Sequence, residues 1–379
     1  MKTVIINAKI VTSSQVIDNG VCVYENGIIT YVGDQMQQGD FVIDCKNKYL
    51  IPGFVDIHCH GGIGYSFMGG KVEHYQTIAG FHLSHGSTTL VATTSTSSNE
   101  SLERALMGYK EYCEQFPKTN VVGVHLEGPW LNPLQCGAMI TELMQTPNAE
   151  QLIDLKNKYP FILRFDAAPE LDKDYQFAKA GKSLGVVMSP AHTDADFAEI
   201  ERAKEYGYTL LTHLYSGMKG VTRKNAYRLA GAVEAGLYFD DLFVEVIADG
   251  KHLPMSLLKF IYKCKGADRI CLVTDAISAS GMPNGTMIGT RIIVEDDVAK
   301  LVDRSSFAGS SATADRLYKT MASAIGKDMV ALSKMASLTP SKVMGLTDRG
   351  EIAVGKRADL IIMTDDLNIE SVYLQGEKV

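Results

Sequence analysis

The chain has 379 residues, of which 46% are hydrophobic and 21% are charged, a composition that is ordinary for a globular protein. The formal net charge of −7 argues against a nucleic-acid partner, because such partners favour a basic surface. No apolar run approaches the roughly 18 residues of a membrane-spanning helix, so we expect no membrane partner. The length exceeds that of one average domain and would fit a barrel with a small satellite domain.

The cysteine pattern indicates a reducing compartment. The seven cysteines are odd in number and include no Cys-x-x-Cys pair, so we expect free thiols. Residues 1–14 alternate like a strand and lack the apolar core of a signal peptide. We therefore expect a cytoplasmic protein.

Residues 1–51 contain short strand-like runs separated by turns, and they show no helical period. Asn26 and Gly27 lie between two apolar runs, which is a strong signal for a β-hairpin. We expect a small β-domain in this part of the chain.

From residue 53 onward, apolar strand-like runs alternate with longer amphipathic segments. Eight such strands with helices between them predict an α/β protein with a (β/α)8 barrel, and a doubly wound sheet is the alternative. No Gly-x-Gly-x-x-Gly opens a helix after a strand, so we expect no dinucleotide site. The expected strands are 54–58, 88–93, 121–125, 161–166, 185–188, 208–212, 243–247 and 270–273, and helices are expected at 99–115, 148–158, 172–183, 195–206 and 254–265.

The first barrel strand carries a candidate metal motif. His58 and His60 are two residues apart on this strand, so they project from one face while Cys59 faces away. Two neutral imidazoles on one face can bind a divalent metal such as zinc. The glycines that follow end the strand and leave space beside the ligands. A chance pair of histidines is the alternative for this motif alone.

Polar side chains also follow the later strands, and active sites of such barrels form at the carboxyl ends of the strands. Glu127 follows the third expected strand, His192 the fifth, His213 the sixth and Asp275 the eighth. We expect the first three to be metal ligands and Asp275 to transfer protons. Taken singly, Glu127 could be a surface carboxylate, the two histidines core residues and Asp275 a helix cap.

Six of the nine histidines fall at or just after expected strand ends, and these include His125 and His252. We expect the other three, His74, His82 and His85, to be ordinary helix or loop residues.

The motifs PGFVDIHCHG, HLEGP, an isolated His192, THLY, IADGKH and LVTDA occur in this order along the chain. Together they resemble the amidohydrolase superfamily, and within it they are most similar to the N-acetylglucosamine-6-phosphate deacetylase family. The resemblance covers essentially the whole chain, including residues 357–362. It implies a distorted (β/α)8 TIM barrel formed by residues 52–344, beside a small β-sandwich domain built from both chain ends, residues 1–51 and 345–379.

The resemblance also implies roles for individual residues. The metal ligands of the family fall on Glu127, His192 and His213, and its catalytic aspartate falls on Asp275. His58 and His60 allow a second ion, so the implied cofactor is one or two divalent metal ions per chain. Zinc is the first choice, and iron or another first-row metal is the alternative. The implied substrate-binding residues are Ala138, Ser216, Gly217, Arg223, Arg228, His252, Phe307, Ala308 and Gly309.

Three stretches depart from the pattern of the family. Residues 216–217 read Ser-Gly instead of Asn-Ala, and residues 137–139 read Gly-Ala-Met instead of Gly-Ala-His. Residues 222–228 replace an Arg-Glu-Pro-Gly segment. In the family, which forms homodimers, an arginine of that segment reaches the phosphate of a substrate in the neighbouring subunit. All three departures concern sugar and phosphate recognition, so the implied reaction is firmer than the implied substrate.

The implied reaction is metal-assisted hydrolysis of N-acetylglucosamine 6-phosphate, an amino sugar phosphate, to glucosamine 6-phosphate and acetate. Asp275 would act as general base and then general acid, and His252 would orient the acyl oxygen or the sugar. The alternatives are an N-acetylgalactosamine 6-phosphate, an unphosphorylated sugar or another N-acyl amine. A cyclic-amide hydrolase with a carbamylated lysine on the fourth strand is a further alternative, but residues 161–166 contain no lysine. A non-enzymatic relative would lack a ligand, and none is missing.

Overall fold

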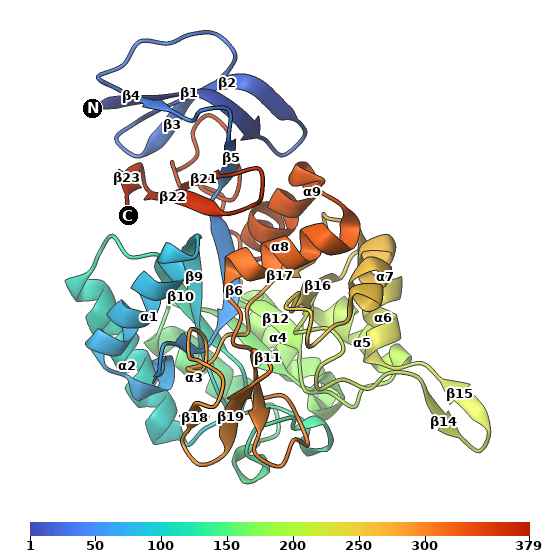
Figure 1. Cartoon of the computed structure of the whole chain (residues 1–379). Coiled ribbons are helices and arrows are strands. Elements are labelled where there is room, and N and C mark those ends of the chain that lie inside the picture. The colour runs from blue at the N-terminus through green and yellow to red at the C-terminus, as the bar shows by residue number, and fades with distance from the viewer.

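The structure is a computed structural model that describes all 379 residues. Figure 1 shows a β-rich part that holds both termini above a larger part in which strands and helices alternate. None of the helices is both long enough and apolar enough to cross a membrane.

Strands from both ends of the chain form one eight-stranded sheet with the order β23-β22-β21-β5-β1-β2-β3, and β4 pairs with β1. The link between the two ends is antiparallel pairing of β5 with β21, for example Ile51 with Ile361. Ile10 and Leu360 belong to one buried apolar cluster, so the two ends share a core. The strands are β1 (Lys2–Val11), β2 (Val16–Glu25), β3 (Ile28–Gly33), β4 (Phe41–Asp44), β5 (Tyr49–Pro52), β21 (Leu360–Met363), β22 (Ile369–Leu374) and β23 (Glu377–Lys378).

Two parallel sheets form the centre of the larger part. One has the order β12-β11-β10-β9-β6 and the other the order β13-β16-β17. Every residue of β6 and β9 is buried, as expected for parallel strands that are covered on both faces. The strands are β6 (Phe54–Cys59), β9 (Ser87–Thr94), β10 (Val121–Leu126), β11 (Ile162–Ala167), β12 (Val187–Pro190), β13 (Leu210–Leu211), β16 (Phe243–Val246) and β17 (Ile270–Leu272).

Isolated parallel bridges connect the edges of these two sheets. Met188 of β12 pairs with Tyr208, just before β13, and Cys59 of β6 pairs with Ala276, beyond β17. The eight expected strands are therefore confirmed, and five of them form half of the expected barrel. Closure of all eight into a full barrel stays a prediction.

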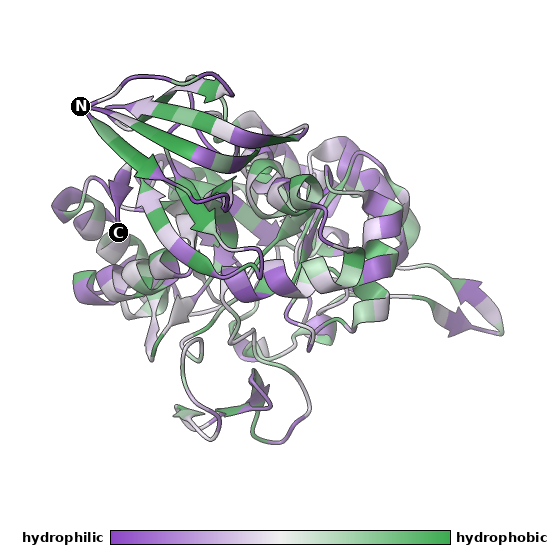
Figure 2. Ribbon diagram, turned by 45° about the horizontal axis from the view of Figure 1, so that its top comes forward, coloured by the Kyte–Doolittle hydropathy of each residue, from purple (hydrophilic) through white to green (hydrophobic).

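Helices flank the parallel strands, and the five expected helices are confirmed as α2, α3, α4, α5 and α7. Local sequence sets where they begin: the Ser98 side chain accepts a hydrogen bond from the Ser101 amide at the start of α2. Figure 2 shows hydrophobic residues along many strands and hydrophilic residues on parts of the helices. The helices are α1 (Val72–Ser84), α2 (Asn99–Gln115), α3 (Ala149–Lys158), α4 (Gln176–Ser183), α5 (Phe197–Tyr206), α6 (Ala232–Tyr238), α7 (Met255–Lys265), α8 (Ala314–Ile325), α9 (Met329–Ser333) and α10 (Thr339–Val343).

Smaller antiparallel elements, which the sequence analysis did not anticipate, complete the fold. The hairpin of β14 (Thr222–Lys224) and β15 (Tyr227–Leu229) extends away from the body, as Figure 1 shows. A three-stranded sheet is formed by β18 (Met287–Ile288), β19 (Ile292–Glu295) and β20 (Val298–Leu301), and a short ribbon by β7 (Gly61–Gly62) and β8 (Tyr65–Ser66).

Candidate metal centre and substrate cavity

The candidate ligands converge at the carboxyl ends of the parallel strands, as the sequence predicts. One group combines His58, His60 and Glu127, and a second combines Glu127 with His192 and His213. All five side chains are buried. Cys59 lies on the opposite face of β6, within a buried apolar cluster. The structure thus brings the predicted residues together, and their role as ligands stays a proposal.

Main-chain hydrogen bonds hold Asp275 beside the histidine pair. The Asp275 amide donates to the carbonyl of His58 at 2.9 Å, and the His60 amide donates to the carbonyl of Ala276 at 2.7 Å. Asp275 Oδ1 consequently lies 3.3 Å from His60 Nε2 and 3.5 Å from His58 Nε2. Asp275 is therefore a second carboxylate, in addition to Glu127, that contacts the pair of histidines.

Three of the converging residues have left-handed backbones. The φ angles are 41° at His192, 29° at His213 and 46° at Asp275. Such conformations cost on the order of 1–3 kcal/mol each in residues other than glycine, and they cluster at functional sites. Other contacts in the fold must therefore offset the free-energy cost of holding these three side chains in their orientations.

The rings of His192 and His213 turn their Nε2 atoms toward Glu127. His192 Nδ1 donates to the Gln135 carbonyl at 2.7 Å, and His213 Nδ1 donates to the Ser216 carbonyl at 3.1 Å. When such a ring is neutral, its one N–H is on Nδ1 and its Nε2 holds a lone pair. These atoms lie 3.2 Å and 2.9 Å from Glu127 Oε1. Acceptors at such distances repel unless a cation lies between them.

The group of His58, His60 and Glu127 also brings side-chain nitrogen and oxygen atoms close together. His58 Nδ1 donates to Glu245 Oε2 at 3.0 Å, and its Nε2 lies 3.3 Å from His60 Nε2. Glu127 Oε2 is 3.1 Å from His60 Nε2 and has no hydrogen-bond partner although it is buried. Glu127 thus offers one carboxylate oxygen to each group.

The electrostatics of the centre favour positive charge. Burial raises the pKa of Glu127, but the surrounding histidines hold it well below its usual range. Burial lowers the pKa of His60, but Asp275 and Glu127 raise it to about 9. Histidine nitrogens and carboxylate oxygens are common ligands of zinc and other first-row metals. The donor set therefore fits a divalent metal ion in either group.

A cavity of about 500 Å³ opens beside the centre. The ring of His252 faces it and is held by Asp249, whose Oδ2 accepts from His252 Nδ1 at 2.8 Å. Seven of the nine expected substrate-binding residues line this cavity, namely Ala138, Ser216, Gly217, His252, Phe307, Ala308 and Gly309. A side chain at position 217 would meet His192, because a Cβ there would lie 2.7 Å from Nδ1 of that ring.

Residues 49–379 match the model of the amidohydrolase family. The chain belongs to the amidohydrolase family. It is 27% identical over 378 residues to an N-acetylglucosamine-6-phosphate deacetylase of Bacillus subtilis, covering 97% of this chain and 94% of the relative. It is 29% identical over 335 residues to an N-acetylgalactosamine-6-phosphate deacetylase of Escherichia coli, covering 87% of each.

A solved structure supports the same grouping. The N-acetylglucosamine-6-phosphate deacetylase of Mycobacterium smegmatis, determined as a mutant in complex with N-acetylglucosamine 6-phosphate, superposes with a TM-score of 0.91. It is 28% identical, and the match covers 100% of this amidohydrolase and 99% of that chain.

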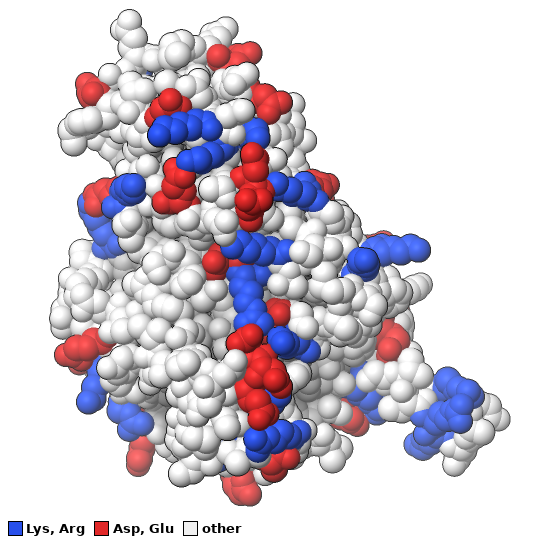
Figure 3. All heavy atoms as spheres, in the orientation of Figure 1, with Lys and Arg blue, Asp and Glu red and all other residues white.

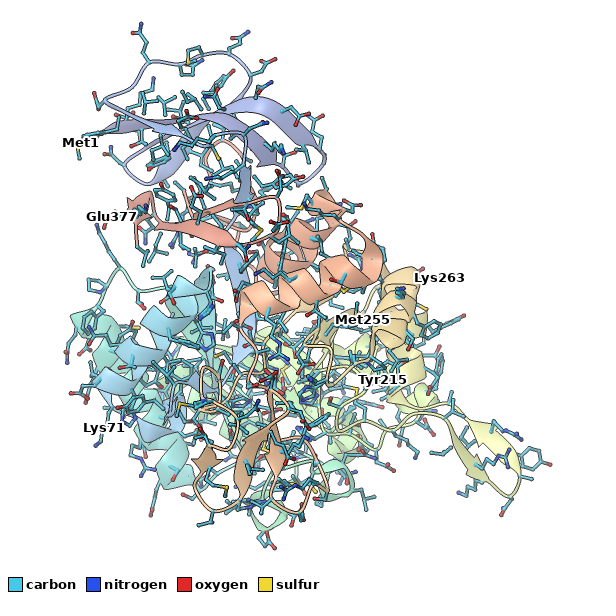
Figure 4. All side chains as sticks on the ribbon, in the orientation of Figure 1. Met1, Lys71, Tyr215, Met255, Lys263 and Glu377 are labelled. Atoms are coloured by element: carbon cyan, nitrogen blue, oxygen red, sulfur yellow. The ribbon has the colours of Figure 1, made fainter.

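Arg223 and Arg228 do not line the cavity of their own chain. They lie on the exposed β14–β15 hairpin, whose tip carries a group of basic side chains in Figure 3. Tyr215, labelled in Figure 4, lines the cavity and lies on the side of the body from which this hairpin extends. The phosphate-binding role of the two arginines stays a prediction.

Arg291, which the sequence pattern did not predict as a site residue, is the one lysine or arginine that lines the cavity of this amidohydrolase. Its Nη2 donates to the Ala138 carbonyl at 3.4 Å, and no carboxylate forms a salt bridge with it. Arg291 lies just before β19, in a stretch whose local pattern does not distinguish it from other surface arginines.

The three histidines expected to lie on a helix or a loop do so, and the absence of a functional role for them stays a prediction. His74 and His82 lie on α1, and His85 follows that helix. His82 is buried, and its Nε2 donates to the Gly61 carbonyl at 2.9 Å.

Proposed function

We propose that this amidohydrolase removes the acetyl group from N-acetylglucosamine 6-phosphate, which gives glucosamine 6-phosphate and acetate. The observation that carries the proposal is the pair of histidine–Glu127 groups, with Asp275 beside them, at the end of a cavity large enough for a sugar. The relatives that bear this activity in their names match nearly the full length of the chain.

We assign one divalent ion to Glu127, His192 and His213, and a second to Glu127, His58 and His60. When bound, such an ion supplies Lewis acidity, which polarises a carbonyl oxygen and makes water easier to deprotonate. Zinc is our first assignment because this donor set suits it, and other first-row divalent metals remain alternatives.

Asp275 is the proton carrier of the proposed reaction. Burial raises the pKa of its carboxyl, but His58 and His60 outweigh this effect and lower it, so the group is ionised near neutral pH. The carboxylate accepts a proton from the attacking water as the new C–O bond forms. It then gives that proton to the nitrogen as the C–N bond breaks, which releases acetate and the free amine. Asp249 holds His252 so that its Nε2 is left for the substrate.

The phosphate of the substrate requires cations near the cavity. Arg291 supplies one from the same chain, because its side chain lines the cavity and has no carboxylate partner. We further propose a homodimer in which the β14–β15 hairpin brings Arg223 or Arg228 to the cavity of the second copy. The exposed position and outward direction of the hairpin support this arrangement.

We also propose that residues 52–344 form one distorted (β/α)8 barrel, with a β-sandwich of residues 1–51 and 345–379 beside it. The parallel bridges at both sheet edges and the shared core of the two chain ends support this division. All seven cysteines are free thiols, which supports a cytoplasmic location.

The galacto epimer is the second candidate substrate, because one full-length relative is named for it. Acetate release should be measured on N-acetylglucosamine and N-acetylgalactosamine, each with and without a 6-phosphate. We expect the highest kcat/KM on N-acetylglucosamine 6-phosphate. Higher efficiency on the galacto epimer would transfer the proposal to that sugar, and release from none of the four would refute it.

A further inference from the structure

Glu245 lies beneath both ligand groups and is fully buried on β16. Its strand neighbours Val244 and Val246 pack into the apolar cluster of the larger part of the molecule. Successive side chains of a strand point to opposite faces, so Glu245 points into the interior between the parallel strands. An ionisable side chain at such a position needs partners for both oxygens.

The Glu245 carboxylate contacts both ligand groups. Its Oε2 accepts a hydrogen bond from His58 Nδ1 at 3.0 Å and another from the main-chain amide of His213 at 3.1 Å. Its Oε1 accepts from Nη1 of Arg164 on β11. One carboxylate therefore ties a ring of the first group to the backbone of the second.

Arg164 keeps this carboxylate charged and in place. The Arg164 guanidinium forms a salt bridge with Glu245 Oε1, and both side chains are fully buried. Arg164 is itself anchored, because its Nε donates to Asp166 Oδ1 at 2.8 Å and its Nη2 donates to Thr212 Oγ1 at 2.7 Å. Asp166 shares this arginine with Glu245, but no candidate metal ligand contacts Asp166.

We infer that Glu245 is a positioning residue: it holds the His58 ring with Nε2 toward His60 and thereby controls the affinity of the second metal site. The inference rests on the metal centre of the proposed function. A neutral imidazole has one N–H, and donation of Nδ1–H to an ionised carboxylate leaves Nε2 as the ligand atom and raises its basicity. Without this acceptor, the His58 ring loses both its orientation and its preferred tautomer.

The test compares Glu245→Gln with Asp166→Asn. Both variants remove one buried negative charge from Arg164 at nearly constant volume, but only Glu245 contacts His58. Metal-free wild type and both variants are titrated with Zn²⁺ against a chromophoric chelator, and their thermal midpoints are recorded. We expect Glu245→Gln to weaken the second ion about 10- to 100-fold, the usual effect of losing such a partner, and the first ion much less. Asp166→Asn should bind both ions nearly as the wild type does.

Equal Zn²⁺ affinities in Glu245→Gln and the wild type would overturn the inference. So would equal weakening in both variants, because that result would reflect the shared arginine. If Glu245→Gln does not fold, long-range ¹⁵N NMR of the Zn²⁺-loaded wild type decides: Nδ1–H with the metal on Nε2 of His58 supports the inference, and the metal on Nδ1 overturns it. The readout is metal binding, so a wrong substrate assignment would leave this result unchanged.

Discussion

His213 directs Nε2 of its ring at Glu127, 2.9 Å from Oε1, while its Nδ1 donates to the Ser216 carbonyl. Two electron-pair acceptors at this distance repel each other unless a proton or a metal cation lies between them. The left-handed backbone at His213 holds the ring in this position independently of such a charge. The fold itself therefore places these groups at a spacing that is compatible with a bound cation.

The pair His58 and His60 should control a second metal ion. Replacing His58 by Gln and His60 by Asn removes two of the three donors of one group, and each ion needs about three protein ligands. We expect the metal content under saturating Zn²⁺ to fall from about two ions per chain to about one. Elemental analysis after gel filtration measures this, and replacing His74 by Gln is the control. A wild-type content of one ion would refute the two-metal assignment.

Asp275→Asn should preserve the fold and the metal but lower turnover by on the order of 10²–10⁴, the usual range for general acid–base catalysis. Asparagine has the shape of aspartate but cannot accept the proton from water. The loss should appear in kcat rather than in KM. A variant that binds less metal would instead show that Asp275 is mainly a ligand.

Arg291→Ala should weaken the handling of phosphorylated substrate by about 1.5–3 kcal/mol, the size of a charged hydrogen bond. The unphosphorylated sugar should be hydrolysed almost unchanged, because it offers no anion to the guanidinium. Arg304→Ala is a matched control, since Arg304 is exposed on the same segment and does not line the cavity. The measurement is kcat/KM on both sugars, and equal losses on the two would remove the phosphate role.

The basic hairpin should act across a dimer. Alone, Arg223→Ala and Asp275→Asn should each be weakly active on the phosphorylated sugar. Mixed dimers of the two variants should recover activity, because the intact Asp275 of one chain meets the intact Arg223 of the other. Co-expression of the two variants under different affinity tags, followed by tandem purification, gives the mixed dimer. Activity no higher than that of the single variants would show that Arg223 serves no neighbouring site, and Arg228→Ala is then tested in the same way.

His82 should make folding stability depend on pH. Burial lowers its pKa to about 4, whereas an unfolded histidine titrates near 6.5. Below about pH 6.5 the unfolded state binds a proton that the folded state does not, so stability falls as the pH drops toward 4. His82→Gln keeps a donor for the Gly61 carbonyl and does not titrate.

We therefore expect the stability of the metal-free wild type, relative to His82→Gln, to be about 2 kcal/mol lower at pH 5 than at pH 7.5. Urea unfolding at the two pH values measures this difference. A difference that does not change with pH would show that the pKa of His82 is the same in the folded and unfolded states.

The candidate ligands could be predicted because each follows a recognisable strand. Parallel strands place their carboxyl ends at one edge, so His58, Glu127 and His213 converge although they lie far apart in the sequence. Arg291 could not be predicted in this way. It reaches the cavity because the segment around β19 packs beside the site. A local sequence pattern does not indicate such packing between distant segments.

The sequence by itself predicted the eight parallel strands, five of the helices, the candidate metal ligands and the family, because periodicity and the spacing of residues are local properties of the chain. The tertiary structure alone decided which nitrogen each ring presents, since that depends on acceptors brought from distant segments, such as Glu245 for His58 and the Gln135 carbonyl for His192. It also decided that the basic hairpin extends away from the body of the molecule and does not line the cavity of its own chain. Hydrogen-bond partners and the direction of a hairpin are set by packing between elements, which the order of residues does not display.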